Sequence, residues 1–271
     1  MSIQNFYEKI PKEFLNDPYH NPNKCKGVPI HPFRMIIAGA SGSGKTNAAL
    51  NLITECNAFE RIYIYAKQLD QPLYEFLIQN LEKVQSKLKK QIITYSSEIS
   101  DIPSPDKFDK TKQNLVIIDD MIMEKNLKSI EELYVRSRNR NCSVIFLSQS
   151  YYPIPKMIRM NTGYLILRGI DNKRDFKMIA TNFSLDKSPD ELFKMYNKAI
   201  KVPMQWFMVD LITTDPKMRY RAGFKPITDE SEQNGGHSRE CDSNSKNANA
   251  LVRCQMGGQL SRLFNLKKIL N

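Results

Sequence analysis

The sequence has no long apolar segment. None of its apolar runs approaches the roughly 18 residues that a helix needs to cross a bilayer. The opening residues, MSIQNFYEKIPKEF, also lack the basic head and apolar stretch of a secretory signal peptide. No membrane span is therefore expected, and we expect the protein in the cytosol or nucleus.

Cysteine is scarce and irregularly spaced. The five cysteines are Cys25, Cys56, Cys142, Cys241 and Cys254. An odd number without regular spacing does not indicate a disulfide framework and is typical of a reducing compartment. Cys241, Cys254 and His237 would supply only three zinc ligands, with no CxxC pair, so a zinc site is not favoured.

Basic residues outnumber acidic ones. The formal net charge is +11, and residues 1–225 carry 34 Lys and Arg against 24 Asp and Glu. The excess therefore belongs to the part of the chain expected to fold, and not to a basic tail. A positive field favours polyanions such as nucleic acid, although charge alone is equally compatible with a protein that gains only solubility from it.

Short apolar runs alternate with helical patterns along most of the chain. Strands are expected at 33–38, 61–66, 92–95, 114–118, 143–147, 164–167, 205–212 and 218–223. Helices are expected at 45–56, 72–88, 129–138, 172–181 and 188–200. Continuous apolar strands separated by helices are typical of a parallel sheet covered on both faces. The sequence thus predicts a three-layer α/β domain with a mostly parallel central sheet.

The two ends differ from this central domain, which we place at residues 33–226. Residues 1–32 contain several prolines and little periodicity, so they are expected to form an extended lead-in. Residues 227–271 are rich in Glu, Ser, Asn, Gly and Gln, which predicts a disordered linker. Within them, residues 259–270 regain helical spacing with basic residues between the apolar ones, which predicts a short basic amphipathic helix.

The most specific motif is a phosphate-binding loop (P-loop). The sequence GASGSGKT at residues 39–46 matches G-x-x-x-x-G-K-[ST] without exception. Its members are Gly39, Ala40, Ser41, Gly42, Ser43, Gly44, Lys45 and Thr46. The loop follows an expected strand and opens an expected helix, the context in which backbone N–H groups cradle phosphates. We predict ATP binding, with Lys45 bridging the β- and γ-phosphates and the Thr46 hydroxyl coordinating Mg²⁺.

Two acids end the apolar strand LVII. Asp119 should emerge at the carboxyl edge of the sheet beside the P-loop, where it can hold Mg²⁺, usually through water. Asp120 is then the better candidate for polarising the attacking water. Acidic pairs at strand ends also cap loops, and that structural reading of Asp120 stays open.

A polar residue ends the next apolar strand. Gln149 follows SVIFL, so its amide can contact the γ-phosphate or the attacking water and respond to hydrolysis. The alternative is a strand-end amide that bonds only to backbone.

Several arginines are candidates for an arginine finger, a guanidinium that a neighbouring subunit places on the γ-phosphate. Arg136, Arg138 and Arg140 lie between an expected helix and the Gln149 strand, and Arg159 lies further along. The first three can equally be a solvated helix end. Spacing does not choose among them, and we take Arg138 and Arg140 as the leading pair.

Taken together, GASGSGKT, LVIIDDM and RSRNRNCSVIFLSQSYYPIPKMIRMN resemble the genome-packaging ATPases of large DNA viruses, virophages and Maverick/Polinton elements. These form the poxvirus-like branch of the FtsK–HerA superfamily. The resemblance runs from about Phe33 to Phe224. It implies a RecA/ASCE-like P-loop domain whose P-loop strand lies between the Gln149 strand and an outer strand. Many relatives have Glu as the second acid, so Asp120, one methylene shorter, is a departure.

The same resemblance implies partners and a setting. It implies a homo-oligomeric ring, a hexamer or pentamer, that pumps double-stranded DNA into a capsid and contacts a capsid or portal-vertex protein. The expected location is the cytoplasm or nucleus of an infected host cell, or the virion. A small-molecule or nucleoside kinase and a nucleotide-regulated assembly protein without turnover are the alternatives. Kinases need a lid and an acceptor pocket, and the intact acid pair argues against a protein without turnover.

Overall fold

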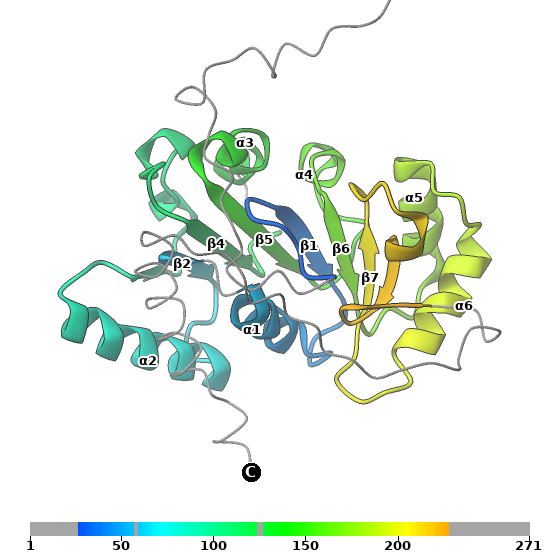
Figure 1. Cartoon of the computed structure of the whole chain (residues 1–271), viewed down its shortest axis with the longest axis horizontal. Helices are drawn as coiled ribbons and strands as arrows, with labels where there is room; N and C mark the ends of the chain where they lie inside the picture. Colours follow the sequence, from blue (N-terminus) through cyan, green and yellow to red (C-terminus); the bar gives the residue numbers. More distant parts are fainter. Residues whose placement is uncertain (1–26, 57–58, 124–126, 228–271) are drawn as a thin grey trace, which may run out of the picture.

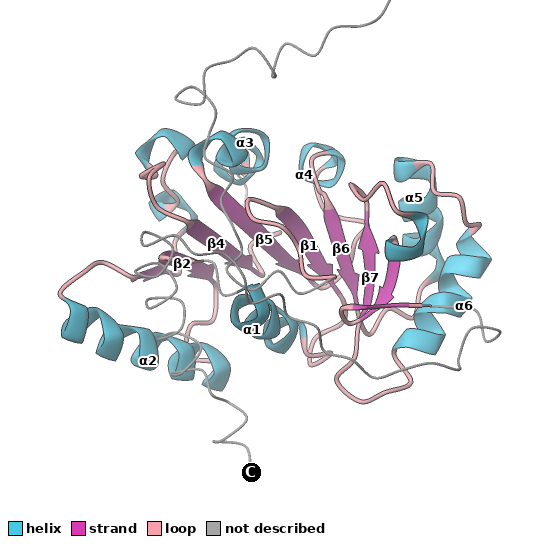
Figure 2. Cartoon of the chain, in the orientation of Figure 1, coloured by secondary structure: helices cyan, strands magenta, loops and turns pink. Residues whose placement is uncertain are grey.

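A computed structural model describes residues 27–56, 59–123 and 127–227. Within them a single nine-stranded sheet has helices on both faces (Figures 1 and 2). The strands are β1 (Arg34–Ala38), β2 (Arg61–Ala66), β3 (Ile93–Ser96), β4 (Asn114–Asp119), β5 (Cys142–Ser148), β6 (Tyr164–Leu167), β7 (Phe207–Asp210), β8 (Tyr220–Ala222) and β9 (Lys225–Pro226). The helices are α1 (Lys45–Cys56), α2 (Pro72–Leu88), α3 (Lys128–Arg136), α4 (Lys156–Met160), α5 (Lys173–Phe183) and α6 (Pro189–Ala199).

The strand order is β3-β2-β4-β5-β1-β6-β7-β8-β9. Pairing is parallel from β3 to β6 and antiparallel from β6 to β9. The predicted mostly parallel sheet is confirmed, and β1 lies between β5 and β6 as the resemblance implied. In the register, Ala38 at the end of β1 pairs with Ser148 and with Leu167. The segments that follow these strands therefore meet at one edge of the sheet, the carboxyl edge.

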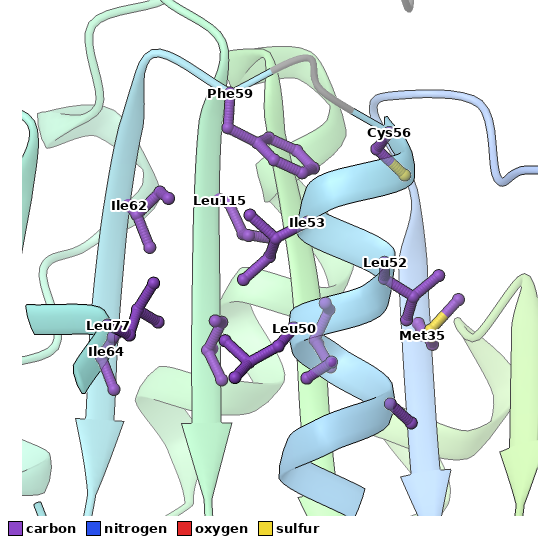
Figure 3. Packing of buried hydrophobic residues seen from close by; sticks show 14 of the residues in the cluster. Met35, Leu50, Leu52, Ile53, Cys56, Phe59, Ile62, Ile64, Leu77 and Leu115 are labelled. Carbon is purple, nitrogen blue, oxygen red and sulfur yellow. The ribbon is translucent and has the colours of Figure 1, made fainter. Parts of the chain in front are cut away.

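Alternating side chains of the strands build two cores. On one face Met35 and Ile37 of β1 pack with α1 and α2 in an apolar cluster, part of which Figure 3 shows. On the other face Ile36 and Ala38 join the residues of α3, α4, α5 and α6. Because successive side chains of a strand point to opposite faces, a strand that is apolar throughout requires cover on both. The three-layer prediction is confirmed on this basis.

Most predicted elements appear with their ends shifted by one or two residues, and the larger differences have local causes. The helix expected at 129–138 is α3 followed by a 3-10 turn, Ser137–Arg140, which ends at Asn141 with φ of 51°. The short α4 was not predicted, because five residues offer too little periodicity. The strand expected at 205–212 is shorter in the structure and ends with β7 at Asp210. There the Asp210 carboxylate accepts hydrogen bonds from the backbone N–H groups of Ile212 and Thr213, which turns the chain.

The segment before β1 packs on the domain. Val28 and His31 are buried, and His31 hydrogen-bonds through its two ring nitrogens to Ser143 Oγ and Asn141 Oδ1, each at 2.7 Å. Residues 27–32 thus contact the core although the lead-in was placed at 1–32. The predicted linker and helix after residue 227, and the three zinc candidates, lie outside the described residues.

Candidate nucleotide-binding site

The P-loop leaves β1 at the carboxyl edge and is held there by backbone bonds from both neighbouring strands. The Gly39 N–H donates to Ser148 O and the Ala40 N–H to Gly169 O, each at 3.0 Å. A Cβ on Gly39 would lie 1.6 Å from Arg168 O, so only glycine fits at that position. Gly42 and Gly44 have φ of 71° and 92°, which turns the chain into the first turn of α1. The predicted strand, loop and helix order is confirmed.

Lys45 begins α1, and its ammonium lies over the loop. Its Nζ donates to Gly39 O at 2.8 Å and to Ala40 O at 3.0 Å. Burial lowers the pKa of Lys45, and the nearby charges of Asp119 and Asp120 act in the opposite direction. The lysine and the acid pair thus share one electrostatic site, as the sequence predicts for a phosphate-binding lysine beside two acids.

Asp119 ends β4 and is almost fully buried, with 6% of its surface exposed. Its Oδ2 accepts a hydrogen bond of 2.7 Å from the Tyr74 hydroxyl, which α2 supplies from the neighbouring layer. Burial raises the pKa of Asp119, while Tyr74, Lys45 and the hydroxyl of Thr46 lower it. Burial is the larger effect, so the pKa of Asp119 stays above its usual value, while the Tyr74 and Thr46 hydroxyls and the charge of Lys45 favour the charged form.

The donors present fit a Mg²⁺ ion carried in with a nucleotide. Thr46 and Asp119 bring a hydroxyl and a carboxylate oxygen together, and Mg²⁺ takes oxygen ligands, typically one or two carboxylates plus phosphates. Across the described residues no group of three or more His, Cys, Asp or Glu could hold a metal. Phosphate oxygens and water commonly complete the ligands of Mg²⁺ in nucleotide sites.

Asp120 and Gln149 meet at the same edge. The Gln149 amide Nε2 lies 3.1 Å from Asp120 Oδ1 and 3.4 Å from Oδ2. Asp120 has φ of 54°, in the left-handed region that Asp adopts more readily than most residues. The amide is thus placed to orient the carboxylate of the second acid, a pairing that the sequence did not predict.

Sequence reasoning also missed Arg168, which follows β6 directly. Its guanidinium donates to Ser43 O of the P-loop and to Gln205 O. The backbone of the same residue donates to Ala38 O at 3.0 Å. Arg168 thus ties the P-loop to β6 and to the segment that precedes β7. A lone arginine after an apolar strand gives no sequence signal of this role, and Tyr74 gives none either because it reads as an apolar-face residue of α2.

The candidate finger arginines do not join this site in the same chain. Arg136, Arg138 and Arg140 precede β5 and so lie at the opposite edge of the sheet, about 20 Å away along the strand. Arg136 and Arg140 both pair with Asp106. Arg138 is exposed and makes no ion pair with a described acid. Arg159 is half-buried, with its guanidinium over the Tyr151 ring and against Met178 Sδ.

Part of the chain matches known proteins. The sequence profile of the family described as "Poxvirus A32 protein" matches residues 24–206. The chain is 29% identical over 137 residues to "DNA packaging protein OPG160" of Variola virus and, equally, of Vaccinia virus, covering 48% of this chain and 50% of each relative. It thus spans about half the length of the curated relatives it matches. No described helix is long and apolar enough to cross a membrane.

The fold has a solved counterpart. The DNA-packaging ATPase B204 from Sulfolobus turreted icosahedral virus superposes with a TM-score of 0.51 and 16% identity, covering 73% of this chain and 99% of that one. At this identity the likeness is one of fold: an α/β domain with a mostly parallel sheet. The profile match covers more than half of the 271 residues. The chain therefore belongs to the Poxvirus A32 protein family.

Proposed function

We propose that this chain is a Mg²⁺-dependent ATPase that translocates double-stranded DNA during the packaging of a viral genome. The observation that carries the proposal is the meeting of the P-loop, Asp119, Asp120 and Gln149 at one edge of the sheet. Membership in the Poxvirus A32 protein family supports it, as does the 29% identity to "DNA packaging protein OPG160" of Variola virus and Vaccinia virus over half of their length.

Each residue of the edge has a task in phosphoryl transfer. The P-loop N–H groups and Lys45 would bind the phosphates, while Thr46 and Asp119 would hold a Mg²⁺ ion, which would supply positive charge against the phosphates. Asp120 accepts the proton of the attacking water or orients it. Gln149, bonded to Asp120, holds that carboxylate in place and changes partner when the γ-phosphate leaves.

Beside the P-loop, the described residues supply little positive charge for the γ-phosphate. Lys45 is one cation of the site, and the guanidinium of Arg168 is engaged by the carbonyls of Ser43 and Gln205. Electrostatic stabilisation is the main contribution to phosphoryl transfer, so we propose a second cation from a neighbouring subunit of a ring, a hexamer or pentamer. Arg138 is the best placed because it is exposed and unpaired among the described residues, whereas Asp106 holds Arg140.

Mixing inactive subunits tests the shared site. Subunits with Asp120→Asn and subunits with Arg138→Ala plus Arg140→Ala should each be inactive, and mixed rings should regain ATPase activity. Mixed rings without activity at any ratio would exclude these arginines and bring Arg159 forward.

ATP hydrolysis and its stimulation by DNA can be tested directly. ATP hydrolysis should depend on Mg²⁺, be abolished in folded Lys45→Ala, and rise when double-stranded DNA is added. Solution mass measured alongside reports the ring. A small-molecule or nucleoside kinase would show no effect of DNA, and an assembly protein without turnover would show no hydrolysis.

The remaining proposals concern the docking partner of the protein and its location. We propose a capsid or portal-vertex protein as the docking partner, in the cytoplasm or nucleus of an infected cell or in the virion. Co-purification of the chain with assembling capsids would test this.

A further inference from the structure

A buried carboxylate links the loop after Gln149 to helix α5. Asp175 is 3% exposed and accepts hydrogen bonds from consecutive residues: Ser150 Oγ at 3.1 Å, the Tyr151 N–H at 3.1 Å and the Tyr152 N–H at 3.2 Å. Because one carboxylate accepts all three hydrogen bonds, it ties this loop to the start of α5.

The same loop carries an exposed aromatic ring that stacks on an arginine. Tyr152 is 45% exposed, and the Arg174 guanidinium carbon lies 3.3 Å from its ring centroid. No described residue accepts a hydrogen bond from that guanidinium or forms an ion pair with it. Stacking fixes the plane of the group while its N–H edges stay free. A planar fork of free donors is suited to phosphate oxygens.

Lys177 extends this cationic surface. It is exposed and three residues after Arg174, which places both side chains on one side of α5. It too has no acidic partner among the described residues, whereas Lys173 is paired with Asp190. We refer to Tyr152, Arg174 and Lys177 as the Tyr152 surface.

We propose that the Tyr152 surface contacts the phosphate backbone of double-stranded DNA, and that Asp175 couples this contact to the nucleotide site. This inference rests on the proposed function. The physical connection runs from Asp120 to Gln149 by a hydrogen bond of 3.1 Å and from there along three consecutive residues to Asp175. A change of Gln149 partner on hydrolysis would shift the loop, Asp175 and the Tyr152 surface together. DNA would then be gripped differently in the two nucleotide states.

The contact is tested by the salt dependence of binding. With a random-sequence duplex titrated from ~50 to ~200 mM salt, the slope of log K against log salt is negative, and each lost phosphate contact reduces its magnitude by about 0.9. Arg174→Ala and Lys177→Ala should each reduce the magnitude of the slope by about one. Lys87→Ala is the matched control, because Lys87 is an exposed lysine of α2, on the other face of the sheet, and forms no ion pair with a described acid; its loss should leave the slope unchanged (Figure 1).

Three results would overturn the contact. One is an unchanged slope in Arg174→Ala and Lys177→Ala while the unmodified protein binds DNA with a steep slope; the proposed function would then stand without this surface. Another is an equal loss in Lys87→Ala, which would indicate a diffuse charge effect. The third is a change of solution mass in Arg174→Ala with no change of slope, which would make the surface a subunit contact. Absence of DNA binding by the unmodified protein would remove the DNA part of the proposed function as well.

The coupling is tested by Asp175→Asn. The measured quantity is the ratio of DNA affinities with and without a non-hydrolysable ATP analogue, which should differ from one in the unmodified protein. In Asp175→Asn the ratio should approach one while the protein still binds both ligands, a loss that a merely structural role would not produce. Ser150→Ala removes only one of the three hydrogen bonds and should bring the ratio partway to one. This variant replaces Asp175→Asn as the test if Asp175→Asn does not fold. A ratio unchanged in both variants, or a ratio of one in the unmodified protein, would overturn the coupling.

Discussion

Replacing Tyr74 by phenylalanine tests the hydroxyl beside Asp119, the carboxylate that we propose as a Mg²⁺ ligand. Tyr74 is 1% exposed, and its ring packs in the core beneath α2, so Tyr74→Phe keeps the packing and removes only the hydroxyl that donates to Asp119 Oδ2 at 2.7 Å. A hydrogen bond to a charged group is worth about 1.5–3 kcal/mol. At 1.36 kcal/mol per factor of ten, this corresponds to a loss of about 10–100-fold, the usual effect of removing a partner that orients a metal ligand.

The assay is a Mg²⁺ titration of fluorescent ATP-analogue binding. We expect the Mg²⁺ concentration at half-saturation to rise about 10–100-fold in Tyr74→Phe. Tyr134→Phe is the matched control, since it removes a buried hydroxyl that donates to Met35 O at 2.5 Å, away from the P-loop. Urea unfolding of both variants separates stability from metal binding. An unchanged Mg²⁺ midpoint in folded Tyr74→Phe would refute the orienting role of the hydroxyl.

Three further results are expected. Gly39→Ala should abolish ATP binding, because its Cβ would lie 1.6 Å from Arg168 O. Gly42→Ala has no atom within 4 Å of its Cβ but a φ of 71°, so it should cost about 1–2 kcal/mol of stability and largely keep ATP binding. Calorimetry of ATP binding and urea melts would compare the two variants. Burial lowers the pKa of His31 from 6.5 to about 4, so the unfolded chain binds a proton at this histidine first as the pH falls. The free energy of unfolding should therefore drop by about 3 kcal/mol between pH 6.5 and 4. Urea melts of His31→Gln should lack this pH-dependent loss of stability. Asp119→Asn should weaken Mg²⁺-dependent ATP binding, while Asp120→Asn should keep ATP bound but unhydrolysed; loss of binding alone in both would contradict their separate tasks.

What could be predicted from the sequence is local. The P-loop is one continuous segment whose glycines and lysine serve a single turn, so residues 39–46 reveal it without any partner. Asp119, Asp120 and Gln149 end apolar strands, and parallel strands place their ends at one edge, so their position at that edge follows from pattern, whereas the hydrogen bond between Asp120 and Gln149 does not. The strand and helix order was predicted for the same reason, because periodicity is read within a few residues.

What only the tertiary structure decided depends on pairs distant in sequence. Tyr74 reaches Asp119 across 45 residues, and Asp175 reaches Tyr151 across 24. Neither pair has a spacing rule, because strand order and helix packing bring them together, and many packings satisfy the same apolar periodicity. The arginines before β5 illustrate the reverse case. They are close in sequence to Gln149, yet the length of the strand puts them at the far edge of the sheet, so sequence proximity to a functional residue gave no proximity in space.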